Sequence, residues 1–415
     1  MSAPPPYDVV IVGAGMVGSS LACALGGSSL RVALVEAKAA AAPGEPGFDG
    51  RSLALSYGSR RIFEGLGLWQ SIRPRAEPIV GIHVSDRGRF GTTRLRAAEH
   101  GVEALGYVAE FAPLGAVVNA AAGEQTNVEL ICPASVAAIE FQPEQVQVQI
   151  GAGEASRTLQ TRLVVAADGA ESAVRSQLGV PARRWDYGQT AVIANVEVSH
   201  PHHGIAYERF TDSGPMALLP LPRSEGRERC ALVWTLKPAD AETALGWNDQ
   251  TFRRHLQARF GLRAGRFGHI GRRQAHPLSL VRAGEQVQER LALIGNAAHT
   301  LHPVAGQGFN LGLRDVAALA ELLVEAQGDV GTRALLQRYA RWRRRDQATV
   351  VAFTDLLARL FTNPLRPVQL ARDLGLLAVD LVPALNRALG RQTMGVSGRL
   401  PRLARGLPLR TGLHP

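Results

Sequence analysis

The sequence predicts an α/β fold with a parallel sheet that binds a dinucleotide, a second, discontinuous domain built on an antiparallel sheet, and C-terminal helices. Three observations lead to this fold class. The segment YDVVIVGAGMVGSSLACAL is typical of a buried strand, a glycine-rich turn and a helix. Short apolar segments separated by turn residues fill the middle of the chain. Beyond Tyr339 the apolar residues recur with helical periodicity.

Length and composition indicate a globular protein with more than one domain. The chain has 415 residues, enough for two or three domains, and 46% of them are hydrophobic. The net charge of +10 comes almost entirely from arginine, because lysine occurs only at Lys38 and Lys237. Coding bias is one explanation of this usage, and attraction to anionic lipid or nucleic acid is the functional alternative. We expect no nucleic-acid partner.

Cysteine spacing and the N-terminus bear on the compartment. Cys23, Cys132 and Cys230 lie far apart, without zinc-ligand or redox spacing, so we expect small buried side chains in a reducing compartment. The N-terminus has no basic region typical of a secretory signal. No uncharged apolar run reaches the roughly 18 residues of a spanning helix. We expect a cytoplasmic protein, with peripheral attachment to the inner membrane as an alternative.

The first glycine-rich turn carries a dinucleotide-binding fingerprint. Gly13, Gly15 and Gly18 have the G-x-G-x-x-G spacing, with a strand before them and a helix after them. A second strand, RVALVEA, ends at Glu36, where a carboxylate is expected to bind ribose hydroxyls. The helix N-terminus would face the phosphates. This pattern predicts a dinucleotide but does not distinguish NAD(P) from FAD.

Two later strands end in turns of the same kind. RLVVAADGAESAVRSQLG ends its strand at Asp168-Gly169. RLALI is followed by GNAAHTLHPVAGQGFNLGLRD, a long uncharged turn that begins at Gly295 and Asn296. Glycines at such a turn allow the backbone to approach a ligand closely. If the three strands are parallel neighbours, their turns converge on one crevice.

These blocks resemble the FAD-dependent aromatic hydroxylases, the group that includes p-hydroxybenzoate hydroxylase, over roughly residues 7–345. The GNAAHTLHPVAGQGFNLG run is similar to the ubiquinone-biosynthesis hydroxylases. GFDGRSLALSYGS and IHVSDRGRFG are similar to the branch that acts on 2-polyprenyl-6-methoxyphenol. The resemblance implies an enzyme in which NADPH or NADH reduces FAD, O₂ forms a C4a-hydroperoxyflavin, and a prenylated methoxyphenol becomes a 1,4-benzoquinol.

The same resemblance implies which residues contact FAD. Gly295 and Asn296 would meet the ribityl–pyrophosphate region, Pro303 would lie on the reactive side of the ring, and the helix from about Gly308 would direct its dipole at the pyrimidine edge. Two departures from the family pattern are Asn296, in place of Asp, and Ala112, in place of an Arg. The complete set of expected cofactor-binding residues is Gly13, Ala14, Gly15, Gly18, Glu36, Arg51, Asp168, Gly295, Asn296, Pro303, Gly306, Gly308 and Asn310.

The predicted domains are discontinuous. The FAD domain would comprise residues 1–78, 99–186 and 280–345, and the substrate domain residues 79–98 and 187–279. Residues 346–415 would form a helical, basic region in which Pro364 and Pro367 break the helices. An apolar helix is expected from Val368 to Leu385, followed by the arginine-rich stretch after Asn386. This region is either a helical cap or a surface for anionic membrane or a lipid-handling partner.

Other chemistries receive less support from the sequence. His299 and His302 have no carboxylate or cysteine at ligand spacing, so no metal site is expected. His203, Tyr207 and His276 lie in substrate-domain segments, but nothing assigns a general base among them. Three alternative functions stay open: hydroxylation of another ring position, reduction of a prenyl chain with FAD, and a non-catalytic flavin-bearing scaffold. Expected partners are a polyprenyl phenol, other ubiquinone-biosynthesis proteins and an anionic membrane surface.

Overall fold

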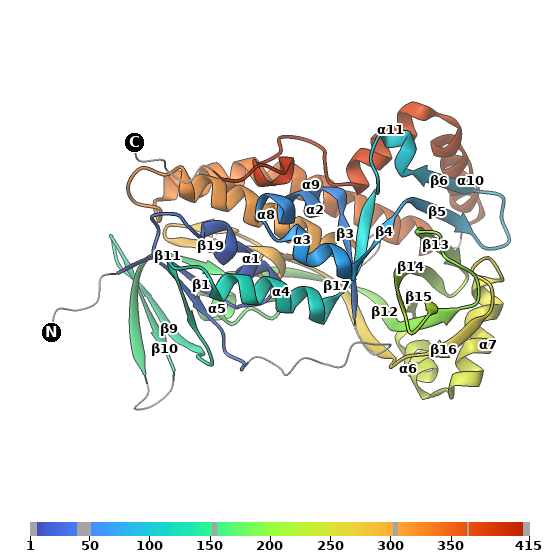
Figure 1. Ribbon diagram of the computed structural model, residues 1–415, viewed down its shortest axis with the longest axis horizontal. Coiled ribbons are helices and arrows are strands. Elements are labelled where there is room, and N and C mark those ends of the chain that lie inside the picture. Colours follow the sequence, from blue (N-terminus) through green and yellow to red (C-terminus); the bar gives the residue numbers. More distant parts are fainter. Residues whose placement is uncertain (1–5, 40–50, 152–155, 302–305, 363–364, 410–415) are drawn as a thin grey trace.

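Two large sheets, one toward each end of the long axis, organise the protein in the computed structural model (Figure 1). The structure describes residues 6–39, 51–151, 156–301, 306–362 and 365–409. A small three-stranded sheet contacts elements of both halves. It consists of β3 (Ser52–Ser56), β7 (Gly106–Glu110) and β4 (Ala76–Ile79).

The first large sheet is the predicted parallel sheet. It has eight strands, and its central order is β18-β19-β11-β1-β2-β8, in which β19, β11, β1, β2 and β8 run parallel to one another. Strand β18 is antiparallel to β19, and β10 is antiparallel to β11. Its central strands are apolar and buried on both faces, as expected when helices cover a parallel sheet. Its strands are β1 (Tyr7–Val12), β2 (Val32–Val35), β8 (Val128–Ile131), β9 (Val136–Phe141), β10 (Val146–Ile150), β11 (Arg157–Ala166), β18 (Val287–Gln288) and β19 (Leu291–Leu293).

Helices α1 (Met16–Leu25), α4 (Phe111–Gly123) and α8 (Gln307–Val324) bury their apolar sides in one continuous core with this sheet. The β9–β10 hairpin and α5 (Ala173–Gln177) lie against the other face. Helices α2 (Tyr57–Gly65) and α3 (Trp69–Ile72) complete this half. The strand that carries the dinucleotide fingerprint therefore has a hydrophobic core on each face of its sheet.

The second large sheet has nine strands in the order β20-β17-β12-β15-β14-β13-β5-β6, with β16 beside β12. Helices α6 (Pro238–Gly246) and α7 (Asp249–Phe260) cover one of its faces. Its strands are β5 (Gly81–Asp86), β6 (Thr92–Arg96), β12 (Ala182–Val198), β13 (Ile205–Thr211), β14 (Gly214–Ser224), β15 (Arg227–Leu236), β16 (Phe267–Ile270), β17 (Gln274–Ala283) and β20 (His299–Thr300).

This sheet is antiparallel as predicted except at one pairing, because β13 and β5 run parallel. The two strands come from distant parts of the chain, so no hairpin turn forces them to be antiparallel. Strands β12 and β17 are long, and their paired ribbon runs from one half of the molecule to the other (Figure 1). The exact domain limits stay a prediction.

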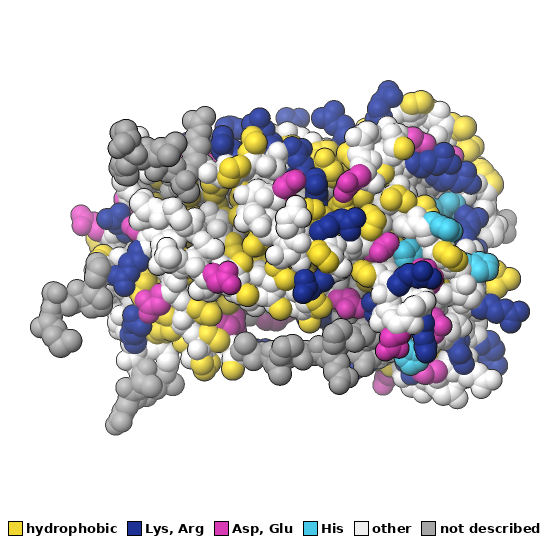
Figure 2. Space-filling model, in the orientation of Figure 1, with side chains coloured by type: hydrophobic (Ala, Val, Ile, Leu, Met, Phe, Trp, Pro, Cys, Tyr) yellow, Lys and Arg dark blue, Asp and Glu magenta, His cyan; other side chains and the backbone are white. Residues whose placement is uncertain are grey.

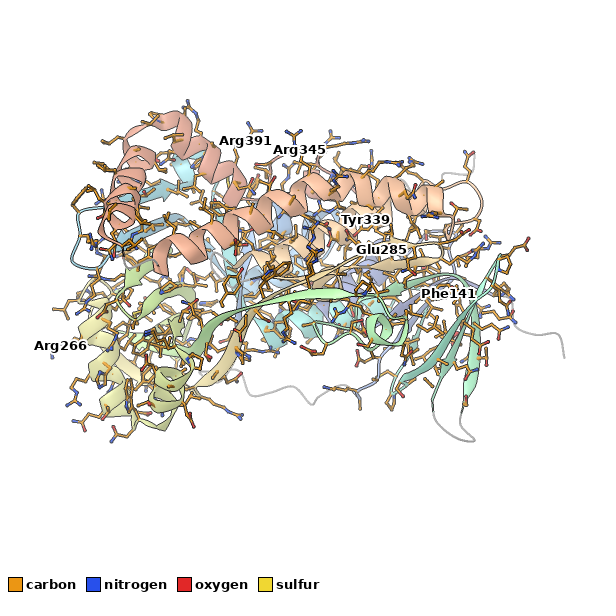
Figure 3. All side chains as sticks on the ribbon, turned by 180° about the vertical axis from the view of Figure 1, so that it is seen from behind. Phe141, Arg266, Glu285, Tyr339, Arg345 and Arg391 are labelled. Carbon is orange, nitrogen blue, oxygen red and sulfur yellow. The ribbon has the colours of Figure 1, made fainter. Side chains whose placement is uncertain are left out.

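The C-terminal region differs from the prediction at two prolines. Helix α9 (Arg333–Thr362) runs along the molecule (Figure 3), followed by α10 (Arg366–Leu381) and α11 (Pro383–Thr393). The prediction of a single helix from Val368 to Leu385 was wrong. Val382 has an extended backbone and ends α10, and α11 begins at Pro383. Pro367 lies in the first turn of α10, where proline is tolerated, and does not break it. Pro364 lies outside the described residues.

The segment after α11 packs against the first half of the protein. Met394, Leu403 and Ala404 are buried, and the Gly58 N–H donates to the Met394 carbonyl at 2.8 Å. The short 3₁₀ helix Leu403–Arg405 contacts α2. This basic region is therefore part of the core rather than a free tail.

The cysteines are less uniform than expected. Cys230 is buried and Cys23 half-buried, but Cys132 is exposed, so its predicted burial was wrong. Cys132 directly follows β8, which lies at the edge of the sheet. Within the described ranges, no cluster of three or more His, Cys, Asp or Glu side chains is suited to a metal ion. No helix in those ranges is both long and apolar enough to cross a membrane.

A buried carboxylate, Asp315 on α8, connects three elements. Its oxygens lie 2.6 Å from Nε2 of His299 on β20 and 2.7 Å from Nε of Arg343 on α9, and Gln347 donates to it at 2.9 Å. Burial alone would raise the pKa of Asp315, but His299 and Arg343 outweigh this effect and hold it well below its usual range. Asp315 is therefore an anion that fixes the third turn and α9 to α8.

Candidate cofactor and substrate site

The three predicted turns meet at one edge of the parallel sheet. Strands β19, β11 and β1 are adjacent and parallel, so their carboxyl ends lie side by side. The predicted side-by-side arrangement of these three strand ends is therefore present, and a shared cofactor crevice at them stays a prediction. Crevices at this edge are the usual ligand sites of open α/β sheets.

The first turn is tightly packed on one side and open on the other. Gly13 has φ +101°, and a Cβ there would lie 2.8 Å from the Ala167 carbonyl oxygen. A Cβ on Gly18 would lie 1.9 Å from the Gly13 carbonyl oxygen. A Cβ on Gly15 would meet nothing within 4 Å, although Gly15 caps α1. The open side at Gly15 provides the approach that a pyrophosphate requires.

Glu36 lies over the same turn. It follows β2, and its carboxylate accepts hydrogen bonds from the N–H groups of Ala14 at 2.8 Å and Lys38 at 2.9 Å. Carboxylate oxygens accept more than one hydrogen bond each, so acceptor capacity remains for ribose hydroxyls. The predicted residues Gly13, Ala14, Gly15, Gly18 and Glu36 are thus brought together.

The second turn leaves a polar atom without a partner. Oδ2 of Asp168 accepts from the Val174 N–H at 3.1 Å, whereas Oδ1 is shielded from solvent and has no hydrogen-bond partner in the described part of the chain. A shielded carboxylate oxygen without a donor is costly, and a ligand hydroxyl would satisfy it. Arg175 donates to the carbonyl oxygens of Ala170 and Ala297 at 2.8 and 2.9 Å, which ties the second turn to the third.

The third turn is held from below by Asn310. Its amide accepts from the Ser56 N–H at 2.8 Å and the Ser59 hydroxyl at 2.6 Å, and it donates to the carbonyl oxygens of Ala54 and Gly306 at 2.8 and 2.7 Å. These four bonds commit the side chain to fixing the start of α8. Direct contact between Asn310 and a cofactor stays a prediction.

The other predicted residues of this turn occupy different positions. Gly295 is buried in a left-handed conformation, and the neighbouring Asn296 is exposed. Gly306 caps α8, which begins one residue later, close to the predicted start. A Cβ on Gly308 would meet nothing within 4 Å. Pro303 lies outside the described residues.

Arg51 lies between the turns and the second sheet. Its guanidinium carbon is 4.6 Å from the centre of the Phe111 ring, and its carbonyl accepts from the Phe111 N–H at 2.7 Å. Burial and then the charge of Arg51 lower the pKa of His276 on β17. This coupling places the guanidinium near the face of the second sheet that is described next.

These turns fit FAD. The unpartnered Asp168 oxygen, the open positions at Gly15 and Gly308 and the carboxylate of Glu36 provide the donors, acceptors and space that a dinucleotide needs. The N-termini of α1 and α8 add free N–H groups at the same edge.

One face of the second sheet carries a cross-strand row of half-buried side chains. The row crosses β17, β12, β15, β14, β13 and β5 in direct register. It lies on the face opposite α6 and α7, the same face on which Asn195, Ala206 and Ala231 contact the three-stranded sheet. At about 4.8 Å per strand it is roughly 24 Å long. Its members are Gln274, Ile193, Val233, Ala217, Glu208 and Val84.

Glu208 is a carboxylate of this row. Burial raises its pKa to about 7, although part of the residue is accessible to solvent. It makes no hydrogen bond or ion pair to any residue that the structure describes. A carboxyl group kept near neutrality at a partly accessible position is typical of a functional site.

The three side chains considered as bases differ in position. His203 is exposed. Tyr207 points to the other face of the sheet, where its ring centre is 5.9 Å from that of Phe260 on α7. His276 is in register with Ala191 on the face of the row, and its Nε2 is shielded without a described partner. Of these three, only His276 lies where a ligand of the row would pass.

Sequence reasoning missed Glu208, Arg175 and Asp315. The alternation in YERF places Glu208 and Tyr207 on opposite faces, but the sequence does not show which face is covered by helices. Arg175 and Asp315 occur inside recognised blocks, but the prediction assigned cofactor contacts mainly to the glycines and polar residues of the turns. Their role is to position turns, which requires knowledge of their distant partners.

The comparisons agree with this site. Residues 6–354 match the family model "FAD binding domain". The chain is 39% identical to ubiquinone hydroxylase UbiL of Rhodospirillum rubrum, over 98% of this chain and 95% of that protein. It is 32% identical to 3-demethoxyubiquinol 3-hydroxylase of Escherichia coli, over 94% and 99%. The solved structure of p-nitrophenol 4-monooxygenase PnpA from Pseudomonas putida shares the fold, with TM-score 0.75, 20% identity and coverage of 95% and 99%.

The glycine geometry predicts different effects at two neighbouring positions. Gly15→Ala adds a methyl group to open space, so we expect unfolding free energy to change by less than about 0.5 kcal/mol. FAD affinity should fall about tenfold or more, because the methyl group blocks backbone approach to the phosphates. Gly18→Ala should instead destabilise the fold. Urea unfolding and FAD titration of both variants provide the measurements, and unchanged FAD affinity in Gly15→Ala would contradict the assignment.

The raised pKa of Glu208 predicts a pH-dependent stability. Below about pH 4 the carboxyl is protonated in both states and burial costs little. As the pH rises toward 7, the unfolded state ionises while the folded state keeps the proton, and above pH 7 the folded state must bury a charge. Wild type should therefore lose about 2–3 kcal/mol of unfolding free energy between pH 5 and pH 9, relative to Glu208→Gln. Denaturant unfolding at several pH values measures this difference. Glu144→Gln, at an exposed position, is the control, and parallel curves for wild type and Glu208→Gln would refute the assignment.

Proposed function

The chain belongs to the FAD binding domain family and is an FAD-dependent hydroxylase of ubiquinone biosynthesis. We propose that it converts a polyprenylated methoxyphenol to the 1,4-benzoquinol. The observation that carries the proposal is the convergence of three FAD turns, beside a long half-buried row, in a chain that matches ubiquinone hydroxylases over nearly its whole length. An extended, largely apolar row suits a substrate with an aromatic head and a prenyl tail.

Bound FAD supplies the redox chemistry, with NADPH or NADH as the electron donor and O₂ as the oxidant. In the balanced reaction, one oxygen atom of O₂ enters the phenol, and the other leaves as water with two electrons from the nicotinamide. No second G-x-G-x-x-G occurs in the chain for the nicotinamide, whose binding is transient in this proposal.

The chain itself binds the cofactor, orients the substrate and shields both from water. Glu36 and Asp168 hold the dinucleotide through hydroxyl groups, and Asn310 and Asp315 fix the start of α8. The row aligns the substrate ring with the cofactor edge, which replaces a bimolecular encounter by a fixed geometry. Glu208 and His276 are the titratable groups facing that path, and an ionised Glu208 would accept a hydrogen bond from the phenol hydroxyl.

Hydroxylation of another ring position is the second candidate. The observation favouring it is the 32% identity to an Escherichia coli protein named for hydroxylation at the 3-position. The two candidates share every residue discussed above and differ in how the ring sits along the row. Product regiochemistry separates them.

Product isotope analysis tests the proposed function. The holoenzyme, with NAD(P)H and a short-chain prenylated methoxyphenol, should incorporate one atom of ¹⁸O from ¹⁸O₂ at the carbon para to the phenol oxygen, as seen by mass spectrometry and NMR. Incorporation at another carbon would support the second candidate. Absence of label, or anaerobic reduction of a prenyl double bond, would reject hydroxylation in favour of a prenyl reductase.

We also propose that the protein acts at a membrane surface on the cytoplasmic side of the inner membrane. A prenyl tail gains about 0.8 kcal/mol per CH₂ in an apolar medium, so the substrate resides in lipid. Leu370, Leu374 and Leu381 on α10 are 52%, 52% and 68% exposed, and α11 adds Leu385 at 46%. Their spacing places them along one side of the α10–α11 pair. This apolar side supports peripheral insertion.

Point substitutions test the membrane proposal, because deletion of the segment after Asn386 would remove core residues such as Met394 and Leu403. Leu374→Asp/Leu381→Asp should lower co-sedimentation with phosphatidylglycerol-containing vesicles at least about tenfold. Leu262→Asp is the control, since Leu262 is 66% exposed near α7. Equal binding by both variants would exclude α10 from the contact, and a carrier protein would then have to deliver the substrate.

A further inference from the structure

A cavity lined by arginine lies between α9 and the C-terminal segment. Its volume is about 830 Å³, within the range of small-molecule sites. Of its described lining residues, only Arg314 comes from the block of the third turn, where it lies on α8, and none is among the expected cofactor-binding residues. One carboxylate, Asp346, lies in the lining. Six arginines line the cavity: Arg314, Arg338, Arg341, Arg343, Arg345 and Arg399.

Two of the arginines are buried. Arg314 and Arg343 are each 2% exposed, and both pair with Asp346, at 2.8 and 2.7 Å. In each guanidinium, one terminal nitrogen, Nη2, is buried without a hydrogen-bond partner in the described part of the chain. Buried donors of this kind normally find an acceptor, and an anion in the cavity would provide one.

The other four lining arginines are exposed. Arg338, Arg341 and Arg345 share one face of α9 with Trp342, at the spacing of successive helical turns. The opposite wall is the segment 397–401, which Trp342 fixes by donating from Nε1 to the Arg399 carbonyl at 3.0 Å. The Arg399 guanidinium carbon lies 4.7 Å from the centre of the Trp342 ring.

Among the described lining residues of this cavity, six arginines face one carboxylate, Asp346. The ion pairs of the described residues include none for Arg338, Arg341, Arg345 or Arg399, although neighbours three and four apart on α9 repel each other. The whole chain has 46 basic and 36 acidic residues, so composition alone does not explain six arginines and one aspartate around one space. Arginine forks match phosphate oxygens in geometry.

The cavity opens on the side that carries the apolar helices. Figure 2 shows lysine and arginine side chains along the upper edge, over α9, and hydrophobic side chains at the upper right, over α10 and α11. In Figure 3, the labelled Arg345 and Arg391 project from this same edge.

We propose that this cavity binds a phosphate-bearing anion, which is either the headgroup of an anionic lipid or a soluble phosphate compound. The anion accepts hydrogen bonds from the exposed guanidinium groups and from the unpartnered nitrogens of Arg314 and Arg343. This binding does not depend on the proposed hydroxylation, and its test has no catalytic readout.

The experiment compares two double variants of the full-length holoenzyme. Arg341→Ala/Arg345→Ala removes two charges of the cavity, and Arg254→Ala/Arg266→Ala removes two exposed arginines near α7. Calorimetric titration with inorganic pyrophosphate and co-sedimentation with phosphatidylglycerol vesicles are measured for wild type and both variants at low ionic strength. The flavin spectrum and the melting temperature establish that each variant is folded.

For at least one probe, the cavity variant should bind about tenfold more weakly than wild type, and the control within about twofold. A loss for vesicles alone identifies a lipid headgroup, and a loss that includes pyrophosphate identifies phosphate chemistry open to soluble ligands. The proposal is overturned if wild type binds neither probe. It is also overturned if both variants lose binding equally, because the effect would then follow net charge.

Discussion

The buried ionic network around Asp315 is the constraint on which the rest of the site depends. A carboxylate inside a protein is tolerated only with partners, and here His299 and Arg343 provide them from two other elements. Removing one partner of such a network typically costs about 3–5 kcal/mol, because a charge stays buried alone. The third turn, α8 and α9 therefore keep one relative position.

This constraint lies in the first half of α8, about one turn from the residue that fixes the start of the helix. At its start, Asn310 holds the backbone of β3 and Gly306, which fixes the helix N-terminus at the strand ends where we expect the flavin. Farther along, Arg314 and Arg343 share Asp346 and form the base of the arginine cavity. The cofactor site and the cavity are consequently built on the same rigid helix.

The sequence predicted the three strand-end turns and their place in the parallel sheet, because these signals are local. A glycine spacing next to an apolar strand defines the first turn, and Asp168-Gly169 and Gly295 follow the same rule. The features that the sequence did not predict depend on contacts between residues far apart in the chain. The break at Val382 and Pro383 was hidden in a continuous apolar pattern, and the burial of Met394 and Leu403 depends on α2 and neighbouring elements. Glu208 required knowledge of which sheet face α6 and α7 cover.

Hydrogen–deuterium exchange with and without FAD tests the central claim most directly, because it reports where the cofactor orders the backbone. The account predicts that FAD slows exchange at the three strand ends, in peptides covering residues 13–18, 168–174 and 295–310, while peptides covering residues 338–345 stay unchanged. Protection confined to other elements, or absent from one of the three turns, would contradict it.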